Sequence, residues 1–211
     1  MNKIQLTPDQ EEVVRLMNAY LDSDEDYKPF TLTGIGGAGK TTVVREVVKY
    51  RSGVIGATIS HSAKFVLEKS LDGCAQCYTV AQLLGLKQVI NEEGEISFIP
   101  NFNRKSDKKL PIENARIVII DECSMIDADT YKFLMSMKDT TCKVIFMGDP
   151  FQLPPVEDSK DSVTFDHTQA ELLKAMRYSG PIADLGNRIR SEIDTINETD
   201  DGTRYLLNIW Q

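Results

Sequence analysis

Short apolar runs alternate along the chain with longer stretches in which apolar residues recur at helical spacing. The apolar runs predict strands at residues 30–33, 54–59, 117–120 and 144–147. Helical spacing predicts helices at residues 8–20, 40–51, 61–70, 79–85, 127–138, 168–177 and 181–195. Because strands and helices alternate, and two runs are continuously apolar, we expect an α/β fold in which helices flank a parallel sheet.

One segment, residues 87–110, breaks this alternation. Two strand-like runs there flank a short turn, residues 91–94, that contains a glycine. Such a turn between two strand-like runs predicts a β-hairpin. We therefore expect a main domain formed by residues 1–86 and 111–190, with the hairpin as a small insert.

Composition narrows the class of protein without changing this picture. The chain is 41% hydrophobic and 27% charged, which is typical of a globular domain. No apolar run approaches the roughly 18 residues of a membrane-spanning helix, and the N-terminus lacks the apolar stretch of a signal peptide. We therefore expect a cytoplasmic protein with no membrane partner. The net charge of -8 argues against a nucleic-acid coat protein, although a basic run within residues 104–116 leaves room for local contact.

Four cysteines are spread through the chain. Cys74 and Cys77 form a single C-x-x-C without the further ligands that a zinc site requires, so we expect no zinc. Cys123 and Cys142 lie in apolar surroundings and are predicted to be buried. All four suit a reducing compartment.

The strongest motif is GIGGAGKT at residues 34–41, which matches the phosphate-binding pattern G-x-x-x-x-G-K-[ST] between a predicted strand and a predicted helix. Glycines let backbone N–H groups surround phosphates, and the helix N-terminus adds positive potential. Lys40 is expected to reach the β- and γ-phosphates, and the Thr41 hydroxyl to bind Mg²⁺. The expected nucleotide-binding residues here are Gly34, Gly36, Gly37, Ala38, Gly39, Lys40, Thr41 and Thr42.

Two further predicted strands end in residues suited to nucleotide hydrolysis. Asp121 and Glu122 follow the strand at 117–120, and parallel strands carry such residues to the ligand-binding edge of a sheet. There, Asp121 can hold Mg²⁺ and Glu122 can polarise the water that attacks the γ-phosphate. Residues 148–156 follow the next strand and contain Gln152, which is placed to sense the γ-phosphate.

Two alternatives share the same phosphate-binding loop. A P-loop kinase would transfer the phosphoryl group to an acceptor, but the adjacent Glu122 favours hydrolysis. A stand-alone nucleotide-binding module would need no chemistry, whereas Lys40, Asp121 and Glu122 are all intact.

Taken in order, these segments resemble superfamily 1 helicases, most closely the RecD-like branch with its Dda-like members. The resemblance extends from Leu6 to about Arg190. It is carried by residues 6–10, 34–41, 60–64, 121–125, 148–156 and 173–177. It implies a RecA-like P-loop NTPase fold, ATP and Mg²⁺ as cofactors, and hydrolysis coupled to 5′-to-3′ movement on single-stranded DNA.

The resemblance also implies roles for single residues. Gln10 would contact adenine, and Arg177 would approach the γ-phosphate. The residues expected at single-stranded DNA are Ser60, His61, Lys64, Thr79 and Phe98. From the residues alone, His61 equally suits a helix start, and for Phe98 packing of the hairpin against the domain is slightly favoured over stacking on a base.

A second RecA-like domain follows the first in this family. Only about 20 residues follow Arg190. The resemblance therefore implies that residues 191–211 begin a missing or truncated second domain. The chain would be the N-terminal half of a motor whose other half is supplied in cis or in trans, and it would hydrolyse ATP poorly in isolation.

Overall fold

The computed structural model describes residues 5–24, 28–90, 96–101, 109–153, 162–166 and 168–174. All of them belong to the first of the chain's two compact units, Met1–Lys174. Some predicted features lie outside the described residues: the turn 91–94, the basic positions 104–108, the end of the segment 148–156, Arg177, the helix at 181–195 and residues 191–211.

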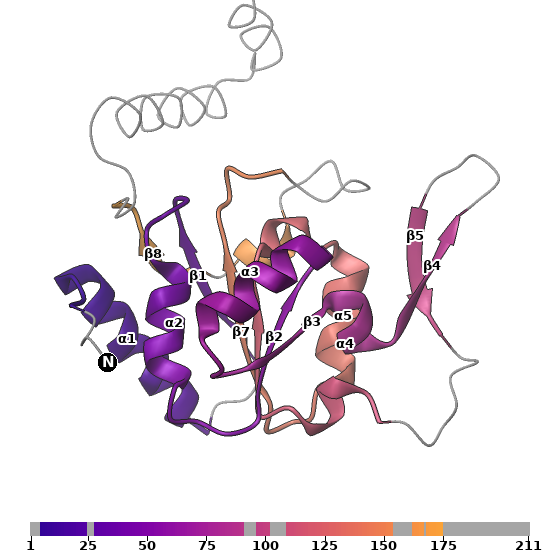
Figure 1. Cartoon of the computed structure of the whole chain (residues 1–211), viewed down its shortest axis with the longest axis horizontal. Helices are drawn as coiled ribbons and strands as arrows, with labels where there is room; N and C mark the ends of the chain where they lie inside the picture. Colours follow the sequence, from indigo (N-terminus) through magenta and orange to yellow (C-terminus); the bar gives the residue numbers. More distant parts are fainter. Residues whose placement is uncertain are drawn as a thin grey trace, which may run out of the picture. The chain divides into compact units, whose positions relative to one another are not determined.

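A six-stranded parallel sheet forms the centre of this unit (Figure 1). Its strand order is β3-β2-β6-β7-β1-β8. The strands are β1 Phe30–Gly34, β2 Val54–Thr58, β3 Gln76–Thr79, β6 Ile117–Ile120, β7 Lys143–Gly148 and β8 Thr168–Leu172. The four strands predicted from apolar runs are confirmed as β1, β2, β6 and β7. Strands β1, β6 and β7 are buried along their whole length, as expected of strands that are covered on both faces.

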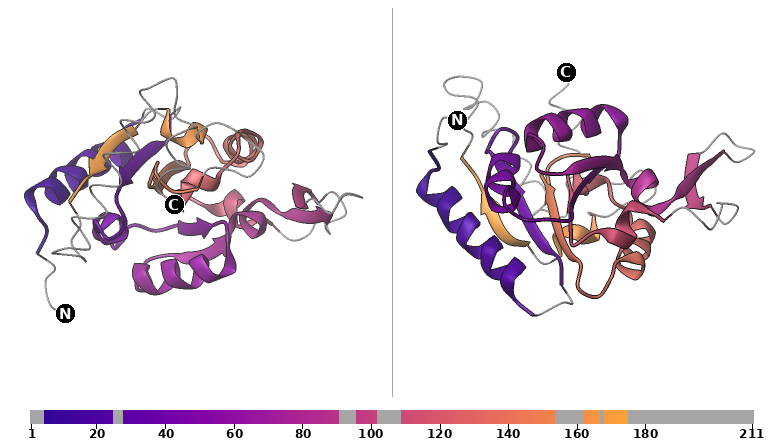
Figure 2. Two further views of the ribbon diagram at one scale, coloured as in Figure 1. Left: turned by 90° about the horizontal axis from the view of Figure 1, so that it is seen from above. Right: turned by 60° about the horizontal axis from the view of Figure 1, so that its bottom comes forward.

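Helices cover both faces of the sheet (Figure 2). They are α1 Pro8–Asp22, α2 Lys40–Val48, α3 His61–Leu71, α4 Val80–Leu84 and α5 Ala128–Met137. On one face, Val118 and Phe146 of the sheet share a buried cluster with Leu134 of α5. On the other face, α3 lies so close to β2 that a Cβ on Gly56 would be 3.1 Å from Leu67. The α/β fold with flanking helices is therefore confirmed.

Two edge strands differ from the sequence prediction. Residues 168–177 were predicted to be helical, but Thr168–Leu172 forms β8, which pairs in parallel with β1. The run contains good helix formers, but Ala170 and Leu172 are buried while their neighbours are exposed, so tertiary pairing overrides helix propensity. Strand β3 was not predicted, because this edge strand is short and only Cys77 and Thr79 of its four residues are buried.

The predicted hairpin is present and extends from one side of the sheet (Figure 1). Its strands, β4 Leu86–Ile90 and β5 Ile96–Pro100, pair antiparallel with Gln88 opposite Phe98. The N–H of Asn101 donates to the Gly85 carbonyl at 3.1 Å and closes the base of the hairpin. Across the described ranges, no helix is both long and apolar enough to cross a membrane.

Candidate active site

The parallel sheet brings the candidate functional residues together at the carboxyl ends of neighbouring strands. The phosphate-binding loop follows β1, Asp121 and Glu122 follow β6, and Asp149 follows β7. These strands are neighbours in the order β6-β7-β1, so their carboxyl ends lie side by side. The Lys40 ammonium is close enough to lower the pKa of Asp121, which counters part of the rise caused by burial. The sequence prediction that these segments meet at one edge is therefore confirmed.

Backbone conformation explains the glycines of the phosphate-binding loop. Gly37 and Gly39 have φ angles of 81° and 88°, in the left-handed region that favours glycine. A Cβ on Gly34 would lie 2.5 Å from the carbonyl oxygen of Leu172 in β8, so no larger residue fits there. Helix α2 begins at Lys40 directly after the loop, which leaves the N–H groups of its first turn available to an anion.

The Lys40 side chain folds back onto its own loop. Its Nζ donates to the carbonyl oxygens of Gly34 at 2.6 Å and Ile35 at 3.2 Å. Phosphate oxygens are stronger acceptors for an ammonium than neutral carbonyls are. A nucleotide would therefore draw Lys40 away from these carbonyls. Thr41 and Thr42 lie half-buried in the first turn of α2.

Gln10 braces this loop from the start of α1. Its side chain is buried, and its Nε2 donates to the Ala38 carbonyl at 3.0 Å. Its Oε1 accepts from the Thr7 N–H at 3.1 Å, within a capping box that begins the helix. A Cβ on Gly39 would be 2.6 Å from the same Nε2. The described contacts of Gln10 are thus with the loop and the helix cap, and its contact with adenine stays a prediction.

Asp121 lies in an enclosed position at the end of β6. Its Oδ1 accepts from the Glu122 N–H at 3.0 Å, and its own N–H donates to the Ala57 carbonyl at 2.9 Å. Loss of water around the carboxylate raises the pKa of Asp121 to about 6, although the Glu122 N–H and the Lys40 ammonium oppose that rise. A nearby cation would stabilise the ionised form of a carboxylate in such an enclosed position.

Asp121→Asn is expected to stabilise the nucleotide-free protein near neutral pH. The folded-state pKa of Asp121, about 6, exceeds its ordinary value of 3.8. The protonated carboxyl therefore makes its full contribution to folding stability below pH 3.8. This contribution to stability is lost as pH rises through about 6, because the carboxylate ionises. At about 1.4 kcal/mol per pKa unit, the ionised carboxylate costs on the order of 2–3 kcal/mol. Asparagine removes that charge and still accepts from the Glu122 N–H.

Urea unfolding of both proteins without nucleotide, at about pH 4 and pH 7, measures this effect. We expect the variant's advantage to appear mainly at the higher pH. A variant that unfolds at the same or a lower urea concentration at both pH values would show that the ionised Asp121 carboxylate does not destabilise the nucleotide-free protein.

Glu122 occupies a strained backbone position. Its φ of 56° places a residue other than glycine in the left-handed region. It begins η2, the short 3₁₀ turn Cys123–Met125, and its carbonyl accepts from the Met125 N–H at 3.3 Å. This backbone conformation is a feature that the sequence did not reveal. Strain of this kind is concentrated at functional sites.

A tight turn follows β7. A Cβ on Gly148 would lie 2.7 Å from Cys123 Sγ, so β7 packs closely against η2. Asp149 is buried, its Oδ1 accepts from the Phe151 N–H at 3.1 Å, and its carbonyl accepts from the Gln152 N–H at 3.0 Å. Gln152 is exposed at the same edge of the sheet as the loop. Its role as a γ-phosphate sensor stays a prediction.

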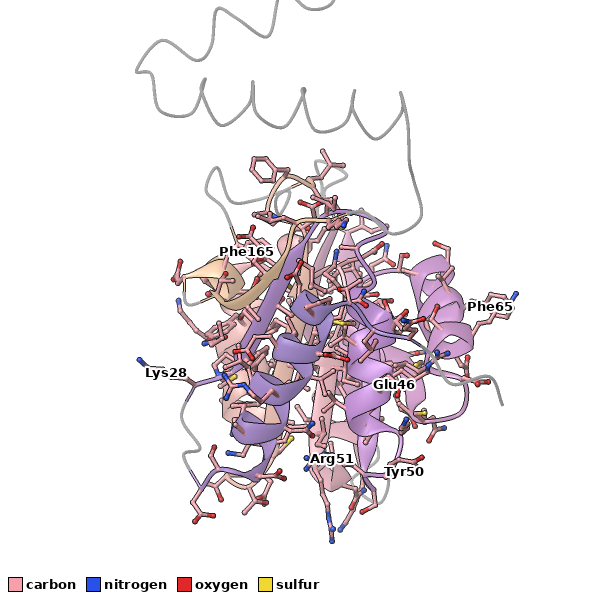
Figure 3. All side chains as sticks on the ribbon, turned by 90° about the vertical axis from the view of Figure 1, so that its left-hand side faces the viewer. Lys28, Glu46, Tyr50, Arg51, Phe65 and Phe165 are labelled. Carbon is pink, nitrogen blue, oxygen red and sulfur yellow. The ribbon has the colours of Figure 1, made fainter. Side chains whose placement is uncertain are left out.

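The DNA candidates that follow β2 lie at the start of α3. Ser60 caps this helix, because its Oγ accepts from the Ala63 N–H at 3.1 Å. His61 is exposed and Lys64 is half-buried. Phe65, which the sequence analysis did not select, is 70% exposed and projects from the same helix into solvent (Figure 3).

The other two DNA candidates lie apart from each other. Thr79 is buried and caps α4, accepting from the Gln82 N–H at 3.2 Å, so its hydroxyl has a structural partner. It pairs in register with Thr58, which places it on the strand end next to the start of α3. Phe98 lies on β5 of the hairpin and is 51% exposed, so part of its ring is open to a ligand.

Two contacts to the active-site turn were missed by sequence analysis. Ser162 donates to the Ile126 carbonyl at 2.6 Å, and Thr164 donates to the Cys123 carbonyl at 3.2 Å. Both hydroxyl-bearing residues are buried. They lie about 40 residues from the turn in the sequence and match no motif, so no local signal could have indicated them.

Comparisons with known proteins agree with this arrangement. The ATP-dependent DNA helicase Dda of Enterobacteria phage T4 is 29% identical over 174 residues, which cover 76% of this chain and 37% of Dda. The ATP-dependent DNA helicase PIF1 of Saccharomyces cerevisiae is 29% identical over 170 residues, which cover 74% of this chain and 18% of PIF1. The chain therefore spans well under half the length of these relatives. The resemblance to superfamily 1 helicases is confirmed.

The fold comparison points the same way. Pif1 from Bacteroides sp., in complex with ADP-AlF4, superimposes with a TM-score of 0.59 and 21% identity, over 95% of this chain and 48% of that one. This similarity confirms the RecA-like fold. Residues 5–197 match the family model described as an AAA domain, which is most of the chain. This chain is therefore a member of the AAA domain family.

Proposed function

We propose that this chain is the N-terminal motor lobe of an ATP-dependent DNA helicase, which hydrolyses ATP to move along single-stranded DNA. The observation that supports this most is the convergence of Lys40, Asp121 and Glu122 at one sheet edge in a chain similar to Dda. A kinase or a non-catalytic module would account for the loop alone. The similarity to Dda extends along most of the chain, well beyond the phosphate-binding loop, and this favours a helicase motor over the two alternatives.

The site suits ATP with Mg²⁺. Thr41 offers a hydroxyl and Asp121 a carboxylate, and such oxygen ligands are the ones that Mg²⁺ prefers. Bound there, Mg²⁺ would neutralise charge that develops on the phosphates. Lys40 would leave its carbonyl partners for the β- and γ-phosphates, and Glu122 would orient and polarise the attacking water.

The pairing of β2 with β6 supports a link between the proposed DNA track and the proposed hydrolysis residues. Strand β2 leads to Ser60 and His61, and it pairs directly with β6, which leads to Asp121. The Asp121 N–H donates to the Ala57 carbonyl of β2 at 2.9 Å. A change at the γ-phosphate would therefore reach the start of α3 across a single strand pair. We propose that this pair couples hydrolysis to DNA contact.

Lys40→Ala tests the nucleotide site directly. Loss of charge-assisted hydrogen bonds to the phosphates is expected to weaken ATP–Mg²⁺ binding about ten- to a hundredfold. Titration calorimetry and a phosphate-release assay measure binding and turnover. Lys49→Ala is the matched control, because Lys49 lies at the other end of α2 and pairs with Glu46 on the surface. Equal affinity and turnover in wild type and Lys40→Ala would disprove the proposed function.

Single-stranded DNA is expected to bind weakly and with strong salt dependence. The net charge of -8 opposes binding, so contact has to come from local groups such as His61 and Lys64. Lys64→Ala should reduce the slope of log affinity against log salt by about 1. Fluorescence anisotropy of a labelled oligonucleotide measures the slope, with Lys69→Ala, an exposed position later on α3, as control. Salt-independent binding would contradict this placement.

A further inference from the structure

Two buried hydroxyls hold the turn that carries Glu122. They come from Ser162 and Thr164, at and within the 3₁₀ turn η3, Val163–Phe165. Ser162 Oγ donates to the Ile126 carbonyl at 2.6 Å, and Thr164 Oγ1 donates to the Cys123 carbonyl at 3.2 Å. Both residues are at most 3% exposed, so water does not compete for these bonds.

The turn itself is weakly secured. It consists of a single 3₁₀ turn in which Met125 and Ile126 donate to the carbonyls of Glu122 and Cys123, at 3.3 and 3.1 Å. Such turns have poor hydrogen-bond geometry, and the left-handed φ of Glu122 adds a conformational cost. Ser124 does not help, because its buried Oγ has no hydrogen-bond partner within the part of the chain that the structure describes. The turn therefore depends on bonds from outside.

Of the two hydrogen bonds that η3 donates to the turn, the one from Thr164 can be exchanged for another. Each hydroxyl has one proton, and the short Ser162 bond to Ile126 uses that of Ser162. The Thr164 proton has three acceptors in reach: the Cys123 carbonyl at 3.2 Å, Ser162 Oγ at 3.0 Å and the Cys123 thiol sulfur. It can serve only one of them fully at a time. The Thr164 hydroxyl therefore decides whether the Cys123 carbonyl receives its second hydrogen bond.

The same segment is bonded to the strand that leads into the phosphate-binding loop. Thr31 Oγ1, in β1, donates to the Thr164 carbonyl at 2.8 Å. Phe165 lies against the end of β7, since a Cβ on Gly148 would be 3.0 Å from its ring. Thr164 thus links β1 to the turn that carries Glu122.

We propose that Thr164 is a positioning residue for Glu122, holding the turn in its reactive conformation through the Cys123 carbonyl. The catalytic part of this inference rests on the proposed function. Thr164 would act by fixing the backbone on which Glu122 stands. Its loss should therefore affect the hydrolysis step more than nucleotide binding.

Thr164→Val removes the hydroxyl and keeps the shape, whereas Thr164→Ser keeps the hydroxyl. In Thr164→Val we expect kcat for ATP to fall about five- to tenfold, corresponding to one hydrogen bond, with little change in KM. Amide exchange at Met125 and Ile126 should accelerate by a similar factor in the nucleotide-free chain. Thr164→Ser should restore both values.

Tyr20→Phe is the matched control for general stability. The Tyr20 hydroxyl accepts from the N–H of Val144 and donates to its carbonyl. Val144 lies near the start of β7, at the opposite end of the strands from the candidate active site. Removing it should lower the urea midpoint without changing kcat or exchange in the turn. Ser124→Ala, which removes an unpaired hydroxyl from the same turn, should likewise leave Met125 and Ile126 protected.

The two claims can fail separately. Equal rates of ATP hydrolysis by wild type and Lys40→Ala would disprove the proposed function. The exchange measurement needs no turnover, so it tests the anchoring of the turn in either case. If Thr164→Val leaves exchange at Met125 and Ile126 unchanged, or lowers kcat no more than Tyr20→Phe does, Thr164 is not a positioning residue.

Discussion

Glu122→Gln is expected to slow ATP hydrolysis about 10²- to 10⁴-fold while ATP–Mg²⁺ still binds. Glutamine keeps the size of the side chain and its place at the start of η2, but it cannot accept the proton of the attacking water. Single-turnover hydrolysis measures the chemical step, and calorimetry with ATP measures affinity. In this variant turnover should therefore fall while affinity for ATP is kept, whereas Lys40→Ala is expected to lower both.

The exposed Glu68 of α3 provides the control for this substitution. Glu68→Gln changes net charge by the same amount, but at a position away from the β6 end. It should hydrolyse ATP at the wild-type rate. Wild-type hydrolysis by Glu122→Gln would show that Glu122 is only a strained acidic residue after a buried strand, and another base would have to be sought.

Residues 1–211 alone are not expected to unwind a duplex. A motor of two RecA-like lobes works by closing the lobes on ATP and reopening them after hydrolysis, and the described residues of this chain form one RecA-like sheet. Closure also brings in arginines that stabilise charge on the phosphoryl group, and such an arginine can be worth about 10³–10⁵ in rate. Arg177 lies outside the described residues, and an arginine from a second lobe would still be needed.

The assay compares a 5′-tailed duplex treated with residues 1–211 and with the same residues joined to a second RecA-like domain. We expect slow, weakly DNA-stimulated hydrolysis and no strand separation from the first sample. The second should show both DNA-stimulated turnover and unwinding. Robust unwinding by residues 1–211 alone would overturn the proposal that this lobe is an incomplete motor.

The central strands were predictable because their environment is simple. Runs such as 117–120 and 144–147 are buried on both faces, so every position is apolar and the pattern is unambiguous. The edge strands were not predictable in the same way. Gln76 and Glu171 are exposed edge residues, and the run that forms β8 has the composition of a helix. Its strand conformation comes from pairing with β1, which no local pattern records.

The same distinction applies to the active site. The phosphate-binding loop and Asp121 were predicted because their chemistry requires fixed residues next to a strand end. Gln10 and Thr79 were assigned to ligands, but the structure shows that each also accepts a hydrogen bond from a local backbone N–H. Thr164 was missed entirely, because a hydroxyl that bonds to a carbonyl 41 residues away leaves no trace in spacing.

The contact between Gly34 and β8 sets a lower limit on the size of an autonomous nucleotide-binding fragment. Strand β8 is at the edge of the sheet, so trimming the chain before residue 168 looks harmless. However, the Leu172 carbonyl accepts from the Ile35 N–H at 3.2 Å and fills the space beside Gly34. A fragment without β8 would lose the wall of its phosphate-binding loop, and limited proteolysis that removes this strand should abolish nucleotide binding. The shortest useful fragment therefore extends through Leu172.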